Sequence, residues 1–257
     1  MELHSITPLV LTFNEQENID RCLNNLSWAK TVVVVDSESS DQTVDQIKRF
    51  PNASVASRRF TNHTDQWNYG LSRVASEWVL TLDADYVVTE ELVDELKALQ
   101  PNHDVYEAAF AYCVHGKALR ASLYPPRALL FRPAKFSYRA DGHTQLLDTS
   151  NTEVGKLRTQ ILHDDRKPLS RWVNSQLKYA ELEASKLAST PHAQLGWKDR
   201  LRTKYVLAPI LTVFYCLFVR GLILDGWPGI YYTMQRVFAE LTLSMTLLER
   251  KWKGVEG

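Results

Sequence analysis

The chain has 257 residues, with 45% hydrophobic and 23% charged residues, a globular mixture that is able to bury the core of one large or two modest domains. The 30 basic residues balance 30 acidic ones, which excludes a generic nucleic-acid binder, so no nucleic-acid partner is expected. The three cysteines are too far apart in the sequence for a metal site and are typical of reduced, buried thiols in an intracellular protein: Cys22, Cys113 and Cys216. No basic and apolar leader opens the sequence, so no secretory signal is expected.

Apolar and helical segments alternate through the first third of the chain. Apolar runs predict strands at residues 6–13, 31–35, 53–57 and 78–82. The helical spacing of apolar residues predicts helices at 15–26, from Thr43 onward, and at 65–75. The run at 31–35 is apolar without alternation, which is typical of a strand that is buried on both faces. Strands that alternate with helices predict a Rossmann-like α/β fold with a mostly parallel sheet and flanking helices.

Polar side chains follow three of these strands at the point where each strand ends. Asn14 and Glu15 follow the first strand, Asp36 ends the second, and Asp83 and Asp85 end the fourth. The carboxyl ends of parallel strands line the cleft in which α/β proteins bind their ligands. A divalent cation would neutralise the two neighbouring aspartates, and Mg²⁺ typically binds one or two carboxylates together with substrate phosphates. The alternative is an ordinary turn with two solvated acids.

A nucleotide at this cleft would not be held by a glycine cradle, because no glycine-rich turn follows the first strand and no P-loop occurs. The series Thr12-Phe13-Asn14-Glu15, then VVVVD with Ser39, Asp41 and Thr43 after it, then LTLDAD, resembles a family 2 glycosyltransferase with a GT-A fold. The resemblance implies a nucleotide pocket lined by Thr12, Asn14 and Glu15. It also implies that Asp36 hydrogen-bonds the base, usually uracil, that Asp83 faces the ribose and sugar, and that Asp85 binds Mg²⁺ or Mn²⁺. Glu38 stands where the family commonly has glycine, so this loop is expected to turn differently.

Further polar residues are expected near the donor. Gln66 and Asn68 lie where such enzymes place donor-contacting groups, and the alternative is a helix N-terminus that is capped by Thr64 or Asp65. A helix is expected at 90–99, and strands at 105–114 and 128–131 extend the sheet on the acceptor side. The basic and aromatic residues that follow are more simply a solvated loop than a phosphate site: Arg127, Arg132, Lys135 and Tyr138.

Two later segments complete the implied site. Asp141 is the best candidate for the general base that an inverting transferase needs, because the chain reads His143-Thr144 where related enzymes often read His-Glu. The alternative for Asp141 is a turn residue before Gly142. A strand expected at 157–162 ends in His163, which resembles a histidine that can complete the metal shell in GT-A enzymes. Arg166 is expected to contact the donor diphosphate, and its alternative is a salt bridge to a neighbouring aspartate.

The end of the chain is helical and partly apolar. Helices are expected at 170–189 and 230–252, and between them a basic segment at 197–204 precedes a nearly apolar run at 205–224. That run approaches the length of a bilayer span, but Pro209 and Arg220 interrupt it. It is therefore expected to lie in the headgroup region of a membrane, and the alternative is a buried core helix.

The pairing of LHDDR at 162–166 with LDGWPG at 224–229 resembles the enzymes that build bacterial lipopolysaccharide core. It implies a GT-A domain over residues 1–166 and a helical, membrane-associated tail over 167–257. The expected reaction is inverting transfer of a hexose, glucose first, from a UDP-sugar to a lipopolysaccharide-core or lipid-linked glycan. The expected location is the cytoplasmic face of the inner membrane, as a peripheral or monotopic protein. Two alternatives stay open: a sugar nucleotidyltransferase, which would need a glycine-rich loop with arginine after the first strand, and a non-catalytic scaffold, which the departures at Glu38 and Thr144 allow.

Overall fold

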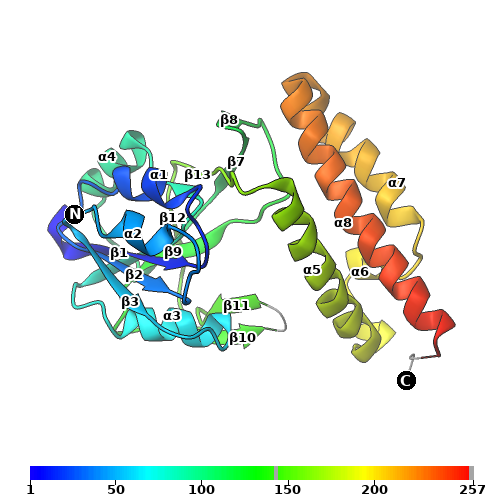
Figure 1. The fold of residues 1–257 in the computed structure, drawn as a ribbon, viewed down its shortest axis with the longest axis horizontal. Helices are drawn as coiled ribbons and strands as arrows, with labels where there is room; N and C mark the ends of the chain where they lie inside the picture. The colour runs from blue at the N-terminus through cyan, green and yellow to red at the C-terminus, as the bar shows by residue number, and fades with distance from the viewer. Residues whose placement is uncertain (142–143, 255–257) are drawn as a thin grey trace. The chain divides into compact units, whose positions relative to one another are not determined.

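The computed structural model describes residues 1–141 and 144–254 and divides the chain into two compact units. The first unit comprises Met1–Gly116 and Leu123–Arg166. The second comprises Lys117–Ser122 and Lys167–Gly257. The first unit is α/β and the second is almost entirely helical (Figure 1).

A seven-stranded sheet forms the centre of the first unit. Its strand order is β12-β6-β9-β4-β1-β2-β3. The strands are β1 (Ile6–Thr12), β2 (Val32–Asp36), β3 (Ala53–Ser57), β4 (Trp78–Asp83), β6 (Val105–Ala108), β9 (Arg127–Phe131) and β12 (Gly155–Lys156). Strands β1 to β4 pair in parallel, as predicted, but β9 runs antiparallel to both of its neighbours, β4 and β6. The sheet is therefore mixed, because β9 interrupts the parallel arrangement of β1 to β4.

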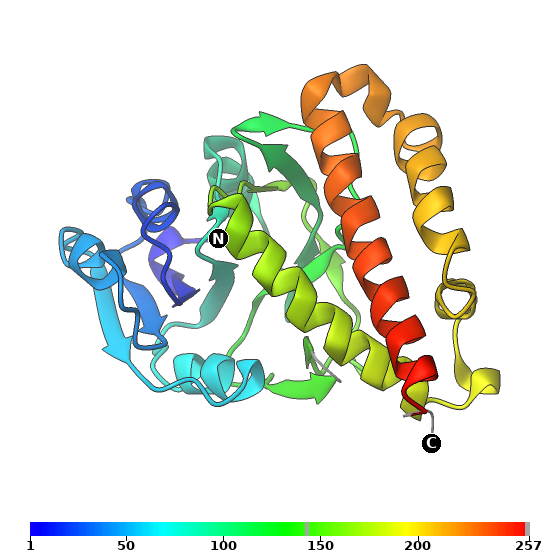
Figure 2. The ribbon, with the colours of Figure 1, turned by 45° about the vertical axis from the view of Figure 1, so that its right-hand side comes forward.

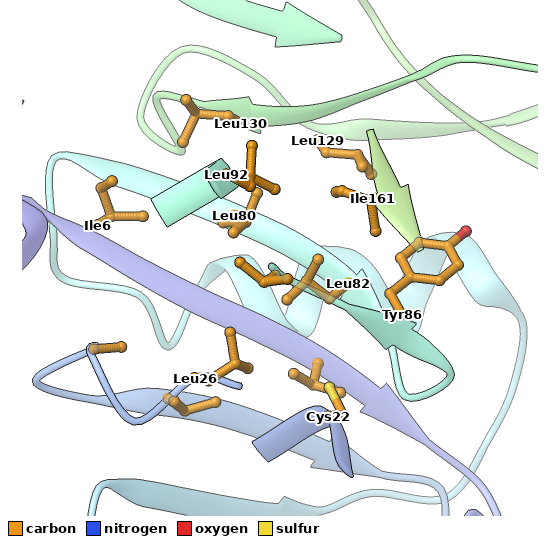
Figure 3. Close-up of a cluster of buried hydrophobic side chains, with 14 of the residues drawn as sticks. Ile6, Cys22, Leu26, Leu80, Leu82, Tyr86, Leu92, Leu129, Leu130 and Ile161 are labelled. Carbon is orange, nitrogen blue, oxygen red and sulfur yellow. The ribbon is translucent and has the colours of Figure 1, made fainter. Parts of the chain in front are cut away.

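Four helices cover the two faces of this sheet. They are α1 (Ile19–Asn24), α2 (Thr43–Ile47), α3 (His63–Leu71) and α4 (Glu90–Ala98). Apolar residues of α1, α2 and α4 pack with one face of the sheet into the larger core cluster (Figure 3). Residues of α3 pack with the opposite face. The consecutive valines of β2 are therefore buried on both faces of the sheet. Val32 and Val34 belong to one cluster, and Val33 and Val35 belong to the other.

Smaller strands complete the first unit. β13 (Ile161–His163) pairs antiparallel with β5 (Tyr86–Val87) and parallel with β7 (Phe110–Val114). The run predicted as one strand at 105–114 is thus divided between β6 and β7, which belong to different sheets. β10 (Tyr138–Asp141) and β11 (Thr144–Leu147) form an antiparallel hairpin that the sequence pattern did not predict.

The second unit contains α5 (Leu169–Ser189), α6 (Trp197–Arg202), α7 (Leu207–Phe214) and α8 (Trp227–Trp252), together with the two-residue strand β8 (Lys117–Ala118). α8 packs against both α5 and α7 (Figure 2). The apolar run predicted at 205–224 is not one helix, because a π-helical turn over Tyr215–Val219 follows α7 and a 3-10 turn over Leu222–Asp225 comes next. Among the described residues, none of the helices combines the length and the apolar character needed to cross a bilayer.

Candidate active site

The ends of β1 and β2 fix a buried carboxylate. Thr12 and Asp36 are paired across these strands, and the Thr12 hydroxyl donates to Asp36 Oδ1 at 2.8 Å. The loop after β2 adds two donors, because the backbone N–H of Ser39 donates to Asp36 Oδ2 at 2.8 Å and the Ser39 hydroxyl donates to Oδ1 at 2.6 Å. Asp36 is fully buried, and these three donors satisfy most of its acceptor capacity.

The loops after β1 and β2 are locked to each other by short hydrogen bonds. The backbone N–H of Asn14 donates to the Ser39 hydroxyl at 2.7 Å, and the backbone N–H of Ser40 donates to Asn14 Oδ1 at 2.7 Å. The backbone N–H of Glu15 donates to the Thr43 hydroxyl, also at 2.7 Å. The predicted pocket residues Thr12, Asn14 and Glu15 are therefore brought together with Asp36 in one rigid corner.

Glu38 holds a left-handed backbone conformation in this corner, with φ +61°. Glycine adopts that conformation most readily, and a side chain there costs roughly 1–2 kcal/mol. Glu38 therefore takes a backbone conformation typical of glycine, and a different turn of this loop from that of the family stays a prediction.

The end of β4 brings an arginine beside the first aspartate. Arg127 opens β9, the antiparallel neighbour of β4, and its Nη1 lies 3.9 Å from Asp83 Oδ2. The guanidinium carbon also lies 5.0 Å from the centre of the Tyr124 ring. Partial burial lowers the pKa of Arg127, but the neighbouring phenols and Asp83 raise it by more. The net pKa therefore lies above its ordinary value, and the side chain stays charged. Arg127 thus opens a strand rather than lying in a loop, and its side chain, which is 38% exposed, lies beside Asp83; a phosphate contact stays a prediction.

The other three members of that predicted loop are also engaged. Arg132 and Lys135 both form ion pairs with Asp104, at 2.9 Å and 2.6 Å, and the ring of Tyr138 is buried. The Tyr138 hydroxyl donates to the Thr81 hydroxyl at 3.1 Å. These partners account for the three side chains without any phosphate.

The second aspartate of the β4 end faces the histidine that closes β13. His163 Nε2 lies 3.3 Å from Asp85 Oδ2, and both side chains are largely buried. Burial lowers the pKa of His163, but the charge of Asp85 and the hydrogen bond to it raise the pKa more, so the net shift is upward. The imidazole is surrounded by the rings of Tyr86, Tyr112 and Tyr124, whose centres lie 4.6 to 5.3 Å from its own. The pairing predicted from sequence between a strand-end aspartate and a distant histidine is thus present in space.

This pair fits two ligands of a divalent cation. Two adjacent ligands of an octahedral cation with bonds of about 2.1 Å lie about 3 Å apart, close to the separation of Asp85 Oδ2 and His163 Nε2. Carboxylate and imidazole together suit Mn²⁺ as well as Mg²⁺. The described part of the chain holds no cluster of three or more histidine, cysteine or acidic ligands.

The two polar residues predicted on α3 are both bonded to protein groups. The buried Gln66 donates through Nε2 to the Ser37 hydroxyl at 2.9 Å, which ties α3 to the loop after β2. Asn68 donates to the backbone carbonyl of Tyr138 at 2.9 Å and accepts from its N–H at 2.8 Å. α3 begins earlier than predicted, and its cap is Asn62, which accepts from the Asp65 N–H, rather than Thr64 or Asp65. The donor contacts of Gln66 and Asn68 stay predictions.

The end of β13 is organised by Asp164, which is almost fully buried. Arg166 donates to Asp164 Oδ2 through Nε at 3.0 Å and through Nη2 at 2.8 Å, which is the salt bridge considered as the alternative to a diphosphate contact. Arg21 donates to the backbone carbonyl of Asp164, and the N–H of Gly116 donates to its Oδ1 at 3.0 Å. The backbone N–H of Asp164 donates to the carbonyl of Asp85 at 3.0 Å. The network therefore supports the strand end that carries His163.

The predicted general base lies at the edge of the described structure. Asp141 ends β10, and its backbone pairs with Thr144 of β11. The side chain of Asp141 and the whole of His143 lie outside the described residues, so the assignment of the base stays a prediction.

Comparisons with known proteins agree on the character of this domain. Glycosyl transferase family 2 matches residues 9–148. An uncharacterized glycosyltransferase of Rickettsia typhi is 31% identical over 103 residues, which is 40% of this chain and 35% of the relative. The SPbeta prophage-derived glycosyltransferase SunS of Bacillus subtilis is 31% identical over 93 residues, which is 34% of this chain and 21% of the relative. These matches thus span about a third or less of the relatives' own lengths.

A solved structure shares the fold along most of the chain. The mannosyltransferase PcManGT from Pyrobaculum calidifontis, in complex with GDP-Man and Mn²⁺, aligns with a TM-score of 0.54 and 14% identity. The alignment covers 96% of this chain and 88% of that one. At this identity the likeness concerns the α/β, GT-A-like fold.

Proposed function

This chain belongs to glycosyl transferase family 2, and from that premise we propose that it transfers a hexose, glucose first, from a UDP-sugar to a lipid-linked or lipopolysaccharide-core glycan with inversion. One observation carries the proposal. Asp36, Asp83 and Asp85 lie at the carboxyl ends of β2 and β4, which flank β1 on its two sides, so a nucleotide sugar laid across this edge meets all of them.

The residues of the chain divide the work along this edge. The corner formed by Thr12, Asn14 and Asp36 holds the nucleoside, and Asp83 faces the ribose and the sugar. Asp85 and His163 would hold Mg²⁺ or Mn²⁺, which when bound supplies positive charge that stabilises the diphosphate leaving group.

Two further side chains complete the proposed reaction. Arg127 adds a permanent positive charge beside Asp83 and is placed to attract the donor phosphates. Asp141 takes the proton of the acceptor hydroxyl, which attacks the anomeric carbon from the face opposite the leaving UDP.

The proposed acceptor also indicates where in the cell the protein acts. A lipid-linked or lipopolysaccharide-core glycan is presented at a membrane, and nucleotide sugars are supplied in the cytoplasm, so we place the protein at the cytoplasmic face of the inner membrane. The helical second unit is the proposed membrane-facing part.

The test is UDP release from a panel of UDP-sugars in the presence of Mn²⁺ or Mg²⁺. Water can accept the sugar slowly, so no acceptor needs to be known. Asp85→Ala is expected to lose metal-dependent release, and to lower the rate by at least about a hundredfold if the metal supplies several kcal/mol. Asp94→Ala, which removes an exposed carboxylate on α4, is the matched control and is expected to keep full activity.

The outcomes separate the proposed enzyme from its alternatives. Metal-dependent release from one sugar names the donor. Metal-dependent UDP binding without release requires a second assay with membrane lipid extract, in which turnover supports an acceptor-gated enzyme and continued silence supports a non-catalytic scaffold. Absence of UDP binding at any metal concentration would overturn the proposal.

A further inference from the structure

One side of the segment that begins with α7 is apolar and open to solvent. The side chains of Leu207, Ile210, Leu211, Phe214 and Phe218 are 44 to 60% exposed. Their spacing of three and four residues puts them on one stripe of the helix and of the π-helical turn that continues it. We call these five residues the α7 stripe. It is an exposed apolar surface of the kind that marks an interaction site on a soluble protein.

The opposite side of the same segment is already buried. Ala208, Pro209 and Cys216 are buried, and α7 packs along α8 (Figure 2). The core of the second unit therefore does not need the α7 stripe. No charged residue occurs from position 205 to position 219, so the stripe and the buried side are apolar together. A helix that is apolar all round but covered on only one side leaves the other side for a partner.

The borders of the stripe are basic and aromatic. Lys198, Arg200 and Lys204 precede it, and all three side chains are exposed. Trp197 and Trp227 stand before and after it and are 74% and 81% exposed. This combination of an apolar band with tryptophan and basic residues at its borders matches an anionic lipid surface, in which rings lie at headgroup level and cations meet lipid phosphates.

Two acidic residues near the stripe form ion pairs with other arginines rather than with these three basic side chains. Asp199 is paired with Arg202 at 3.4 Å, and Asp225 is paired with Arg120 at 2.8 Å. Among the residues that the structure describes, no ion pair engages Lys198, Arg200 or Lys204, which favours an anionic lipid surface over a second copy of the same basic face.

We propose that the α7 stripe lies in the boundary between the headgroups and acyl chains of an anionic membrane, with α7 parallel to the surface. Eight helical residues extend about 12 Å, well short of a hydrocarbon core of about 30 Å. Gly221, with φ +68°, and the 3-10 turn end the helical path after Val219. This inference rests on the membrane association that is part of the function proposed above, and it identifies the α7 stripe as the surface that binds the membrane. It is tested by lipid binding rather than by turnover.

The experiment is co-sedimentation of the full chain with vesicles of phosphatidylcholine alone or with 30% phosphatidylglycerol, the fraction being roughly that of a typical anionic leaflet. The wild type is expected to bind the anionic vesicles and to bind them less at high salt. The double variant Ile210→Glu and Phe214→Glu should lower the partition coefficient by about tenfold or more, because it removes two apolar anchors and repels the surface. Both positions are exposed, so the thermal unfolding midpoint is expected to stay close to that of the wild type.

Controls keep the result specific. Met245→Glu places the same charge on an apolar residue of α8 that is 69% exposed and lies outside the α7 stripe, and it should bind vesicles like the wild type. UDP release by the double variant with a soluble donor should equal that of the wild type, so a failed transferase proposal and a failed membrane proposal give different results.

Either of two outcomes would overturn the inference. One is equal vesicle binding by the wild type and the double variant. The other is absence of vesicle binding by the wild type together with a dimer, detected by sedimentation velocity, that the double variant dissociates; this would assign the stripe to a second copy of the chain.

Discussion

Asp36 and Asp85 are both buried at strand ends, but their surroundings prepare them for different partners. Asp36 already accepts three hydrogen bonds from Thr12 and Ser39, so it acts as a fixed acceptor in a rigid corner. Asp85 instead faces an imidazole whose pKa is raised by that carboxylate. The raised pKa favours a proton on His163. A cation bound between the two side chains would replace that proton, because either one places a positive charge beside the Asp85 carboxylate. The difference supports the assignment of Asp36 to the nucleoside and Asp85 to the metal.

Arg127→Gln tests whether the guanidinium beside Asp83 binds the donor. We expect UDP affinity to fall about tenfold, because a charge-assisted hydrogen bond is worth about 1.5 to 3 kcal/mol. Isothermal titration with UDP in the presence of Mn²⁺ measures it, and Arg127→Lys should recover part of the loss. Arg49→Gln removes an exposed arginine that pairs with Asp20 and serves as the control. Unchanged UDP affinity in Arg127→Gln would limit the arginine to neutralising Asp83.

The site residues divide into those that the sequence predicts and those that it does not. The sequence predicts Asp83 and Asp85 because they stand where an apolar run ends, and the end of a strand can be recognised from one local pattern. The sequence does not predict the contact of Arg127 with Asp83, because this contact depends on the antiparallel pairing of β9 with β4. The sequence of a strand does not identify the strand with which it pairs. The role of His163 could be proposed only from the resemblance, and not from its local pattern.

At the scale of elements, α3 connects the loop after β2 with the β10–β11 hairpin. Gln66 reaches the loop after β2, and two residues later Asn68 binds both backbone groups of Tyr138. Trp67 lies between them and packs its ring 5.4 Å from that of Tyr138. The hairpin that carries Asp141 is therefore fastened to the same helix that supports the loop after β2.

Asn68→Ala separates a structural role from a donor contact. It leaves the N–H and C=O of Tyr138 without these partners, so we expect the free energy of unfolding to fall by about 1 to 2 kcal/mol, measured by urea denaturation. UDP affinity should change by less than about twofold if the amide serves the hairpin alone. A loss of UDP affinity by about tenfold with unchanged stability would instead establish the predicted donor contact.

A second element-scale contact joins α4 to the segment before β13, and it should make stability depend on pH. Partial burial raises the pKa of Glu95, but the hydrogen bonds that Arg158 and Thr159 donate to its carboxylate lower it more, and the net pKa lies below the ordinary 4.5. The stabilisation is thus present above the unfolded-state pKa and is lost as the pH falls through the folded-state pKa.

Glu95→Gln should therefore cost about 1 kcal/mol at pH 7 and progressively less below pH 4.5, where the wild-type carboxylate becomes protonated. Urea denaturation of both proteins at several pH values measures the difference. Glu153→Gln changes an exposed carboxylate of the same unit and controls for general charge effects. A difference that stays constant with pH would contradict this account.

The helices and the hairpin show where sequence patterns reach their limit at this scale. The amphipathic spacing of 90–99 predicted α4 to within one residue, since a regular apolar stripe marks a helix along its whole length. The β10–β11 hairpin was missed because its stability comes from the side of α3, through Asn68 and Trp67, rather than from the pattern of its own strands.

At the scale of the whole molecule, the chain forms two units whose cores have different origins. The first is built on a sheet with helices on both faces, and the second on helices that pack side by side. No sequence pattern assigns residues 117–122 to the second unit, because they are joined to it by contacts between distant residues, such as the ion pair of Arg120 with Asp225 at 2.8 Å and the hydrogen bond that Arg220 donates to the carbonyl of Ser122 at 2.7 Å. Long-range pairs of this kind are invisible to local patterns.

Arg202 links three helices of the second unit, and this gives a prediction for the whole molecule. Arg202 of α6 pairs with Glu240 of α8 at 2.8 Å and with Glu183 of α5 at 3.3 Å, and the two glutamates are only 12% and 15% exposed. Arg202→Met would leave both carboxylates buried without this cation. We expect a loss of about 2 kcal/mol, less than for a fully buried pair because the arginine is 28% exposed.

Hydrogen–deuterium exchange with mass spectrometry locates that loss. Exchange should become faster in α5, α6 and α8 of Arg202→Met and should stay unchanged in β1, β2 and β4, since the two units have separate cores. Arg250→Met breaks the pair of Arg250 with Glu181, whose side chain is 60% exposed, and should change exchange little because exposed pairs contribute less than about 1 kcal/mol. Faster exchange throughout the central sheet in Arg202→Met would mean that the two units unfold as one, and the division of the molecule into independent cores would then be wrong.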